Sequence, residues 1–208
     1  MTLSKEIWAV WGAVAAIGGP LIFNMFKEMY FDRKKRETER NYILVQLIFI
    51  LDKFTAACAR VAWDDGYPPD EPPSEIRVIQ VSDPVFDLSS VKGEYKYLSP
   101  EQLYRLQAID IKLIQIKEKL RSYEMLDYPA SDRYFASRRR LYIELGLYTD
   151  SLIQEIRHQS NIKHNAWNNE VSPVDSIKNS QLQLNKMRSV RTLKQMERKA
   201  KNAMKSPF

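Results

Sequence analysis

The longest uninterrupted apolar stretch of the chain lies near its N-terminus, from Ile7 to Phe26 (IWAVWGAVAAIGGPLIFNMF). It contains no charged residue, and Asn24 is its single strongly polar side chain. A helix of about 20 such residues spans roughly 30 Å, which is the thickness of the hydrocarbon layer of a bilayer. The pattern therefore predicts a transmembrane helix over residues 7–26.

The charges that flank this apolar segment are unevenly distributed. Before it stand Lys5 and the terminal amine, and after it stand Lys27, Arg33, Lys34, Lys35, Arg36 and Arg40. Basic residues accumulate on the cytoplasmic side of membrane helices. We therefore expect a single-pass protein of the plasma or inner membrane, with residues 1–6 outside and residues 27–208 in the cytoplasm.

Two other interpretations of the apolar segment stay open. A cleaved signal peptide would use Ala13-Val14-Ala15 as its processing site. The apolar run continues past that point, however, and the basic cluster follows the run instead of preceding it. The second alternative is the core helix of a soluble domain. The length of the run and its basic flank favour the membrane anchor.

Residues 27–41 contain neither glycine nor proline, so they are expected to continue the helix as a basic stalk. The next apolar run, Tyr42–Leu51, is too short to span a bilayer. Its apolar positions recur every three or four residues, as on a core-facing helix. They are Ile43, Leu47, Ile50, Phe54, Ala57 and Val61. We expect this helix to end near Trp63, with a second membrane span as the alternative.

An irregular, proline-rich segment is expected from about residue 64 to residue 98. It opens with Asp64-Asp65-Gly66-Tyr67-Pro68-Pro69, a strong break in helical structure. Residues 76–81 and 85–86 are extended in pattern, but an isolated strand leaves its hydrogen bonds unmade. The segment therefore predicts irregular structure with at most a short edge strand.

Two further helices are expected after this segment. Ser99-Pro100-Glu101-Gln102 forms a capping box with proline at the first helical position, which predicts a helix over 100–126. Asp110 interrupts its apolar stripe, either as a buried ion-pair partner or at the exposed margin. After a short turn at 127–131, a helix over 132–161 should pack antiparallel to it. On that helix we expect Arg138, Arg139 and Arg140 to face solvent.

A loop over 161–171 and a last helix over about 173–204 complete the expected chain. Ser172-Pro173-Val174-Asp175 repeats the N-cap pattern. The predicted fold class is all-α: an N-terminal transmembrane helix followed by a cytoplasmic helical bundle of three to four helices. Residues 42–171 would form the helical domain, and residues 172–208 a basic C-terminal helix or tail.

Charge is concentrated at the C-terminal end. Residues 172–208 carry a net charge of +7, whereas the whole chain carries +6. Three interpretations stay open: a solvated helix face, attachment to anionic lipid headgroups, and non-specific contact with nucleic-acid phosphates. The residues expected to contact headgroups are Lys186, Arg188, Arg191, Lys194, Arg198, Lys199 and Lys201.

One short pattern resembles a known family. Arg157 and His164 are separated by six residues, with His158 directly after the arginine. This resembles the Arg-x6-His signature of HEPN-type ribonucleases, which are helical bundles. The resemblance covers eight residues and implies that Arg157 and His164 would line a dimer cleft and act on RNA phosphodiester bonds. The alternative is two exposed cations at a helix C-terminus, where the helix dipole favours them.

Other chemistry is sparse. The chain has one cysteine, Cys58, which lies among alanines on an apolar helix and is expected to be a small buried residue. Glu155-x-x-His158 has the spacing of half a di-iron motif, but the second half is missing. We therefore expect no metal, no cofactor and no catalytic site. The expected function is a membrane-anchored, non-enzymatic interaction protein that binds an unidentified protein partner or itself.

Overall fold

The structure is a computed structural model that describes residues 3–68, 77–126, 131–163, 167 and 171–205. The side chains of residues 3–22, 124–126, 200 and 202–205 are not among those described. Regular structure within these ranges is entirely helical: α1 (Leu3–Trp63), the short 3-10 helix η1 (Tyr95–Tyr97), α2 (Pro100–Leu126), α3 (Asp132–Ser160) and α4 (Pro173–Lys205). The expected all-α fold class is confirmed to that extent.

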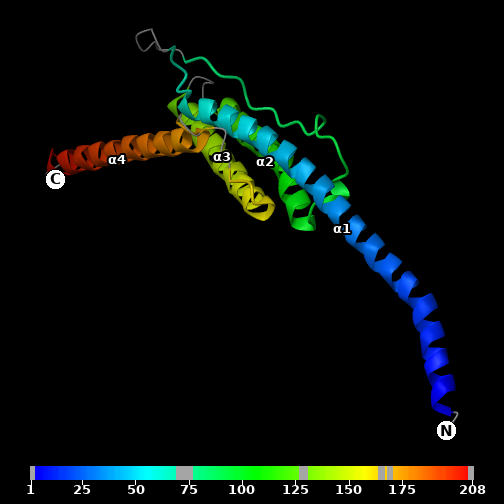
Figure 1. Cartoon of the computed structure of the whole chain (residues 1–208). Helices are drawn as coiled ribbons and strands as arrows, with labels where there is room; N and C mark the ends of the chain where they lie inside the picture. Colours follow the sequence, from blue (N-terminus) through cyan, green and yellow to red (C-terminus); the bar gives the residue numbers. More distant parts are fainter. Residues whose placement is uncertain (1–2, 69–76, 127–130, 164–166, 168–170, 206–208) are drawn as a thin grey trace.

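Helix α1 joins three segments that the sequence pattern separates: the apolar segment, the stalk and the core-facing helix. Residues 21–63 contain neither glycine nor proline, so nothing in the backbone interrupts the helix. It ends at Trp63, as predicted, where the backbone turns through Gly66 at a φ of 86°. The N-terminal part of α1 projects beyond the other helices (Figure 1).

One stretch of the described part of α1, within Phe23–Trp63, is long and apolar enough to cross a membrane. Half of this stretch, 50%, is buried against the rest of the protein. A core helix of a soluble protein passes the same test of length and composition. The burial therefore favours the core-facing role predicted for residues 42–63 over a second membrane span. The apolar segment 7–26 forms the N-terminal end of the same helix.

Helix α3 is antiparallel to both α1 and α2. Its C-terminal half meets the N-terminal half of α2, where Gln102 donates a hydrogen bond to Gln159 at 2.8 Å. Against α1, the hydroxyls of Thr55 and Thr149 lie 2.8 Å apart, and Arg157 reaches Asp52 at 2.9 Å. The predicted antiparallel pairing of α2 and α3 is confirmed, although the turn at 127–130 lies outside the described residues.

The start of α2 follows the predicted cap at Ser99, and the structure adds a cap at Ser131 for α3. The amide of Gln102 donates to Ser99 Oγ, and the amide of Ser99 donates to Gln102 Oε1, both at 3.1 Å. Ser131 Oγ accepts from the amide of Tyr134 at 3.2 Å and begins α3. Asp110 is exposed, so it stands at the margin of the apolar stripe. These caps fix the N-termini of α2 and α3.

The expectation that Arg138 and Arg139 face solvent is wrong. Arg138 is fully buried and donates to Asp64 Oδ2 at 2.7 Å and to Asp83 Oδ1 at 2.9 Å. Arg139 is 5% exposed and donates through Nε to the carbonyl of Ala62 at 2.8 Å. Only Arg140 of the three is exposed, because α1, α4 and the segment over residues 77–98 surround the N-terminal half of α3.

The segment between α1 and α2 is irregular, as expected, and contains no strand over its described residues 77–98. Asp64 ties it to the end of α1: its carboxylate accepts from the amides of Gln80 and Val81 at 3.1 and 3.0 Å. The ring of Phe86 packs edge-on against Phe54, with centroids 5.2 Å apart. Side chains, in place of strand pairing, therefore hold this segment on the helices.

Candidate functional site: the free half of α4

Helix α4 begins with the predicted N-cap. Ser172 Oγ accepts a hydrogen bond from the amide of Asp175 at 3.1 Å and donates to its carboxylate at 2.7 Å. Pro173 occupies the first helical position, where a backbone amide would make no hydrogen bond within the helix, so proline loses nothing there. Asp175 adds a negative charge in the first turn, which the helix dipole favours. The cap fixes where α4 starts relative to α3.

The first turns of α4 dock onto α1 and α3. Ile177 is fully buried over Gly146, where a Cβ atom would meet Ile177 Cδ1 at 2.4 Å and Cys58 Cβ at 3.2 Å. Trp63 Nε1 donates to Ser176 Oγ at 2.9 Å. Ser180, also buried, donates to the carbonyl of Ala62. This close contact holds the start of α4 rigidly.

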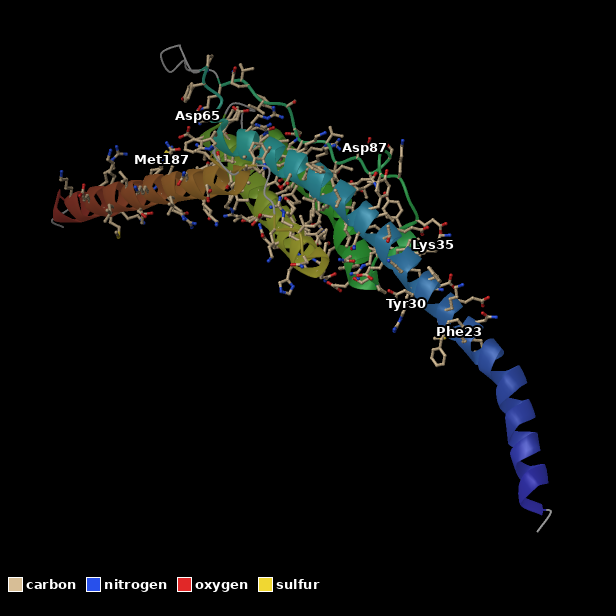
Figure 2. All side chains as sticks on the ribbon, viewed as in Figure 1. Phe23, Tyr30, Lys35, Asp65, Asp87 and Met187 are labelled. Atoms are coloured by element: carbon tan, nitrogen blue, oxygen red, sulfur yellow. The ribbon has the colours of Figure 1, made fainter. Side chains whose placement is uncertain are left out.

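Beyond Leu184, α4 leaves the other helices. Every residue from 185 to 199 is exposed, as is Lys201. We call residues 185–205 the free half of α4. Figure 1 shows it projecting from the packed helices at the end away from the N-terminal part of α1. In Figure 2 its side chains, Met187 among them, extend outward around the helix. The sequence predicts this helix, but the exposure of its far half appears only in the structure.

The free half has two unlike faces. Val190, Leu193 and Met196 recur every three residues and are 50–56% exposed, and Leu182 lies in line with them. The opposite face of the helix carries most of the charge, since a helix turns about 100° per residue. Its basic residues are Arg188, Arg191, Lys194, Arg198 and Lys199. The free half is thus a basic amphipathic helix.

The seven residues predicted to contact headgroups all lie on this exposed part of α4. Five are on the basic face, and Lys186 and Lys201 stand on the apolar side. Arg191 pairs with Asp132 of α3 at 2.9 Å, although both side chains are at least half exposed, at 61% and 50%. An exposed ion pair is worth at most about 1 kcal/mol. The ion pair therefore adds little stability, and Arg191 can exchange Asp132 for another anion at low cost.

A groove of about 690 Å³ runs between α3 and α4, beside the basic face. Its lining includes Arg77, Arg133, Arg139, Arg140, Arg188 and Arg191. Asp132 pairs with both Arg77 and Arg191, and so bridges the irregular segment to α4. The pKa of Arg139 is lowered, because the effect of burial exceeds the opposing effect of the carboxylates of Asp65 and Asp64. The groove extends the basic surface of α4 onto α3.

Arg157 has a partner within the fold. Its Nη2 donates to Asp52 at 2.9 Å, and both side chains are largely buried, at 11% and 15% exposed. The pKa of Asp52 is raised, because the effect of burial exceeds the opposing effect of the Arg157 charge. The two residues line a polar pocket of about 360 Å³ that also includes Asp150 and Lys178. His164 lies outside the described residues, so the Arg-x6-His arrangement has no described geometry.

Cys58 is fully buried, as predicted, and burial raises the pKa of its thiol. A raised pKa keeps the thiol protonated and unreactive. His158, of the half di-iron spacing, is exposed. Within the described part of the chain, no group of three or more His, Cys, Asp or Glu residues could hold a metal ion.

Comparisons of the chain with family models, with curated proteins and with solved structures returned no match.

Proposed function

We propose that this chain is a membrane-anchored, non-enzymatic interaction protein. In this proposal Ile7–Phe26 crosses the plasma or inner membrane and holds a helical bundle at the cytoplasmic face. The free half of α4 is its binding surface for anionic lipid. The observation that carries the proposal is the exposed amphipathic helix, with its basic and apolar faces turned apart.

Two energy terms support lipid as the ligand. Each Lys or Arg near an anionic leaflet gains about 1 kcal/mol, reduced by salt. The apolar face of such a helix can enter the boundary between headgroups and acyl chains. Val190, Leu193 and Met196 supply that face.

Nucleic acid remains the competing ligand for the basic face, because phosphate contacts need only positive charge. The free half carries no aromatic residue over its described positions 185–199 and 201, so bases would have no ring to stack on. An apolar stripe has no role in phosphate contact. These features favour lipid over nucleic acid.

The test places a fluorescent label on either face of α4 in the full-length protein, held in lipid nanodiscs. Leu193→Cys puts the label on the apolar face, and Lys194→Cys, the matched control, puts it on the basic face. In anionic discs the label at 193 should be shielded from an aqueous quencher and the label at 194 should not. Zwitterionic discs should shield neither. Equal quenching at both sites in anionic discs would reject lipid binding.

A further inference from the structure

An exposed seam runs along α1, on the side turned away from the packed helices. Its positions alternate between spacings of four and three residues, which keeps them on one face. They are Phe31, Lys35, Thr38, Tyr42, Val45 and Phe49. Phe31, Tyr42 and Phe49 are 54–56% exposed, and Val45 is 39% exposed. Large apolar side chains at this spacing are typical of the contact line of a coiled coil.

Up to Lys35 the described residues leave this seam uncovered, whereas from Thr38 to Gln46 residues 92–97 lie along one of its flanks. In Figure 1 the part of α1 before the packed helices has no other segment beside it. Figure 2 shows the side chains of Tyr30 and Lys35 standing free on that part. Toward its C-terminal end the seam reaches Asp52, which is already committed to Arg157. The contact line is therefore exposed up to Phe49, and both of its flanks are open over residues 27–35.

The residues that flank the seam carry a second pattern. Lys27 and Lys34 stand on one side of it, and Asp32 and Glu39 stand on the other. Asp32 follows Lys27 by five residues, and Glu39 follows Lys34 by five. In a parallel pair of helices in register, those flanking positions face each other across the contact. Lys27 would meet Asp32 of the other helix, and Lys34 would meet Glu39.

An antiparallel pair would instead place like flanking positions together. Lys27 and Lys34 would then face lysines, and Asp32 and Glu39 would face acids, which costs free energy. Glu39 also accepts a hydrogen bond from Tyr97 of its own chain, but a carboxylate has capacity for a second donor. The charges thus select a parallel partner whose sequence matches that of α1.

We infer that the seam pairs with a second copy of this chain, as a parallel coiled coil over residues 27–49. Glu28 and Lys35 lie within the contact line, where polar residues fix register at some cost in stability. The proposed anchor supplies the orientation, because two copies inserted the same way present α1 in parallel. The inference uses only that part of the proposed function and does not involve the lipid contact of α4.

The first test is disulfide cross-linking of full-length protein in native membranes. Thr38→Cys places a thiol within the seam, and Arg33→Cys places one at an equally exposed stalk position outside it. A disulfide requires Cα atoms within about 7 Å, so mild oxidation should produce dimers of T38C and leave R33C monomeric. The buried Cys58 stays in both variants and in the wild-type control. No dimer of T38C, or equal dimer with R33C, would overturn the inference.

The second test concerns register. Lys27→Glu sets glutamate against Asp32 of the other copy and should weaken the dimer, whereas the double variant K27E/D32K restores opposite charges and should recover it. Val45→Glu buries two carboxylates in the seam and should raise the dimer dissociation constant by about 100-fold. Sedimentation in mild detergent measures these changes, with circular dichroism to confirm folding. A double variant no better than K27E would contradict the parallel register.

Failure of this inference is separable from failure of the anchor. Each sample is first divided into membrane and soluble fractions. Recovery of the wild type in the soluble fraction would refute the anchor, and cross-linking of T38C in that fraction would still support the seam. A membrane-bound T38C that stays monomeric would refute the seam and leave the anchor intact.

Discussion

Arg138 is the residue that shows most directly how the irregular segment is held in place. Its guanidinium is fully buried, as is the carboxylate of Asp64, and Asp83 contributes a second carboxylate. Asp64 also accepts two backbone amides of the segment. One buried cation thus connects α3, the end of α1 and residues 80–83. Losing it leaves a buried carboxylate without a counter-charge.

Arg138→Ala should therefore lower the free energy of unfolding by about 3–5 kcal/mol, as expected when one partner of a buried ion pair is removed. Arg140→Ala, at the exposed neighbouring position, should change it by no more than about 0.5 kcal/mol. Denaturant unfolding of both variants measures the difference. Similar stabilities for the two would contradict the structural role of Arg138.

The run of three arginines hides a signal in the spacing: Arg138 stands four residues after Tyr134 and three before Leu141, on the apolar stripe of α3. Three successive arginines on an amphipathic helix normally mark its solvent face. The apolar stripe shows which side of α3 is buried, but it does not show how many neighbours surround the helix. The acids that neutralise Arg138 lie 74 and 55 positions away in the chain, so the pairing is invisible until the fold is known.

Cys58 predicts a pH dependence of stability. Burial raises the pKa of its thiol in the folded protein. In the unfolded chain the thiol has a pKa of about 8.5. The folded state therefore binds more protons, and stability is fully present below pH 8.5 and falls as pH rises above it. The unfolding free energy of the wild type should fall by up to about 1.4 kcal/mol per pH unit relative to Cys58→Ala. Parallel slopes for the two proteins between pH 8 and 10 would contradict the burial.

Among the elements, α4 packs most closely on its neighbours where Ile177 meets Gly146. Gly146→Ala would bring a Cβ atom to 2.4 Å from Ile177 Cδ1. We expect a loss of about 1–3 kcal/mol, in spite of the higher helix propensity of alanine. Ile177→Val removes the clashing methyl group, so the double variant should be more stable than G146A alone. Thermal unfolding of the three proteins tests this, and a double variant less stable than G146A would contradict the packing.

The helices were largely predictable because their ends carry local signals. Ser99 and Ser172 cap α2 and α4 where the pattern places them, and Asp64 through Gly66 end α1. The basic residues of α4 were also evident from charge alone. That residues 185–199 extend beyond the packed helices was not predictable, since it depends on where α3 begins relative to α4. The seam on α1 is visible only once residues 27–63 are known to form one continuous helix.

At the scale of the whole molecule, α1 and α4 leave the packed helices in different directions (Figure 1). The apolar segment forms one extremity and the basic amphipathic helix forms the other. If the first is a membrane anchor, lipid contact through α4 gives the chain a second attachment at its opposite end. The anchor is thus the premise on which the proposed function most depends.

The most direct test of that premise is alkaline carbonate extraction of membranes that contain the full-length protein. The wild type should remain in the membrane pellet. The double variant Val14→Arg and Ile17→Arg, which places two charges in the apolar segment at about 2.5–3.5 kcal/mol each, should move to the supernatant. Extraction of the wild type by carbonate, or retention of both proteins to the same extent, would contradict the account of a chain anchored through residues 7–26.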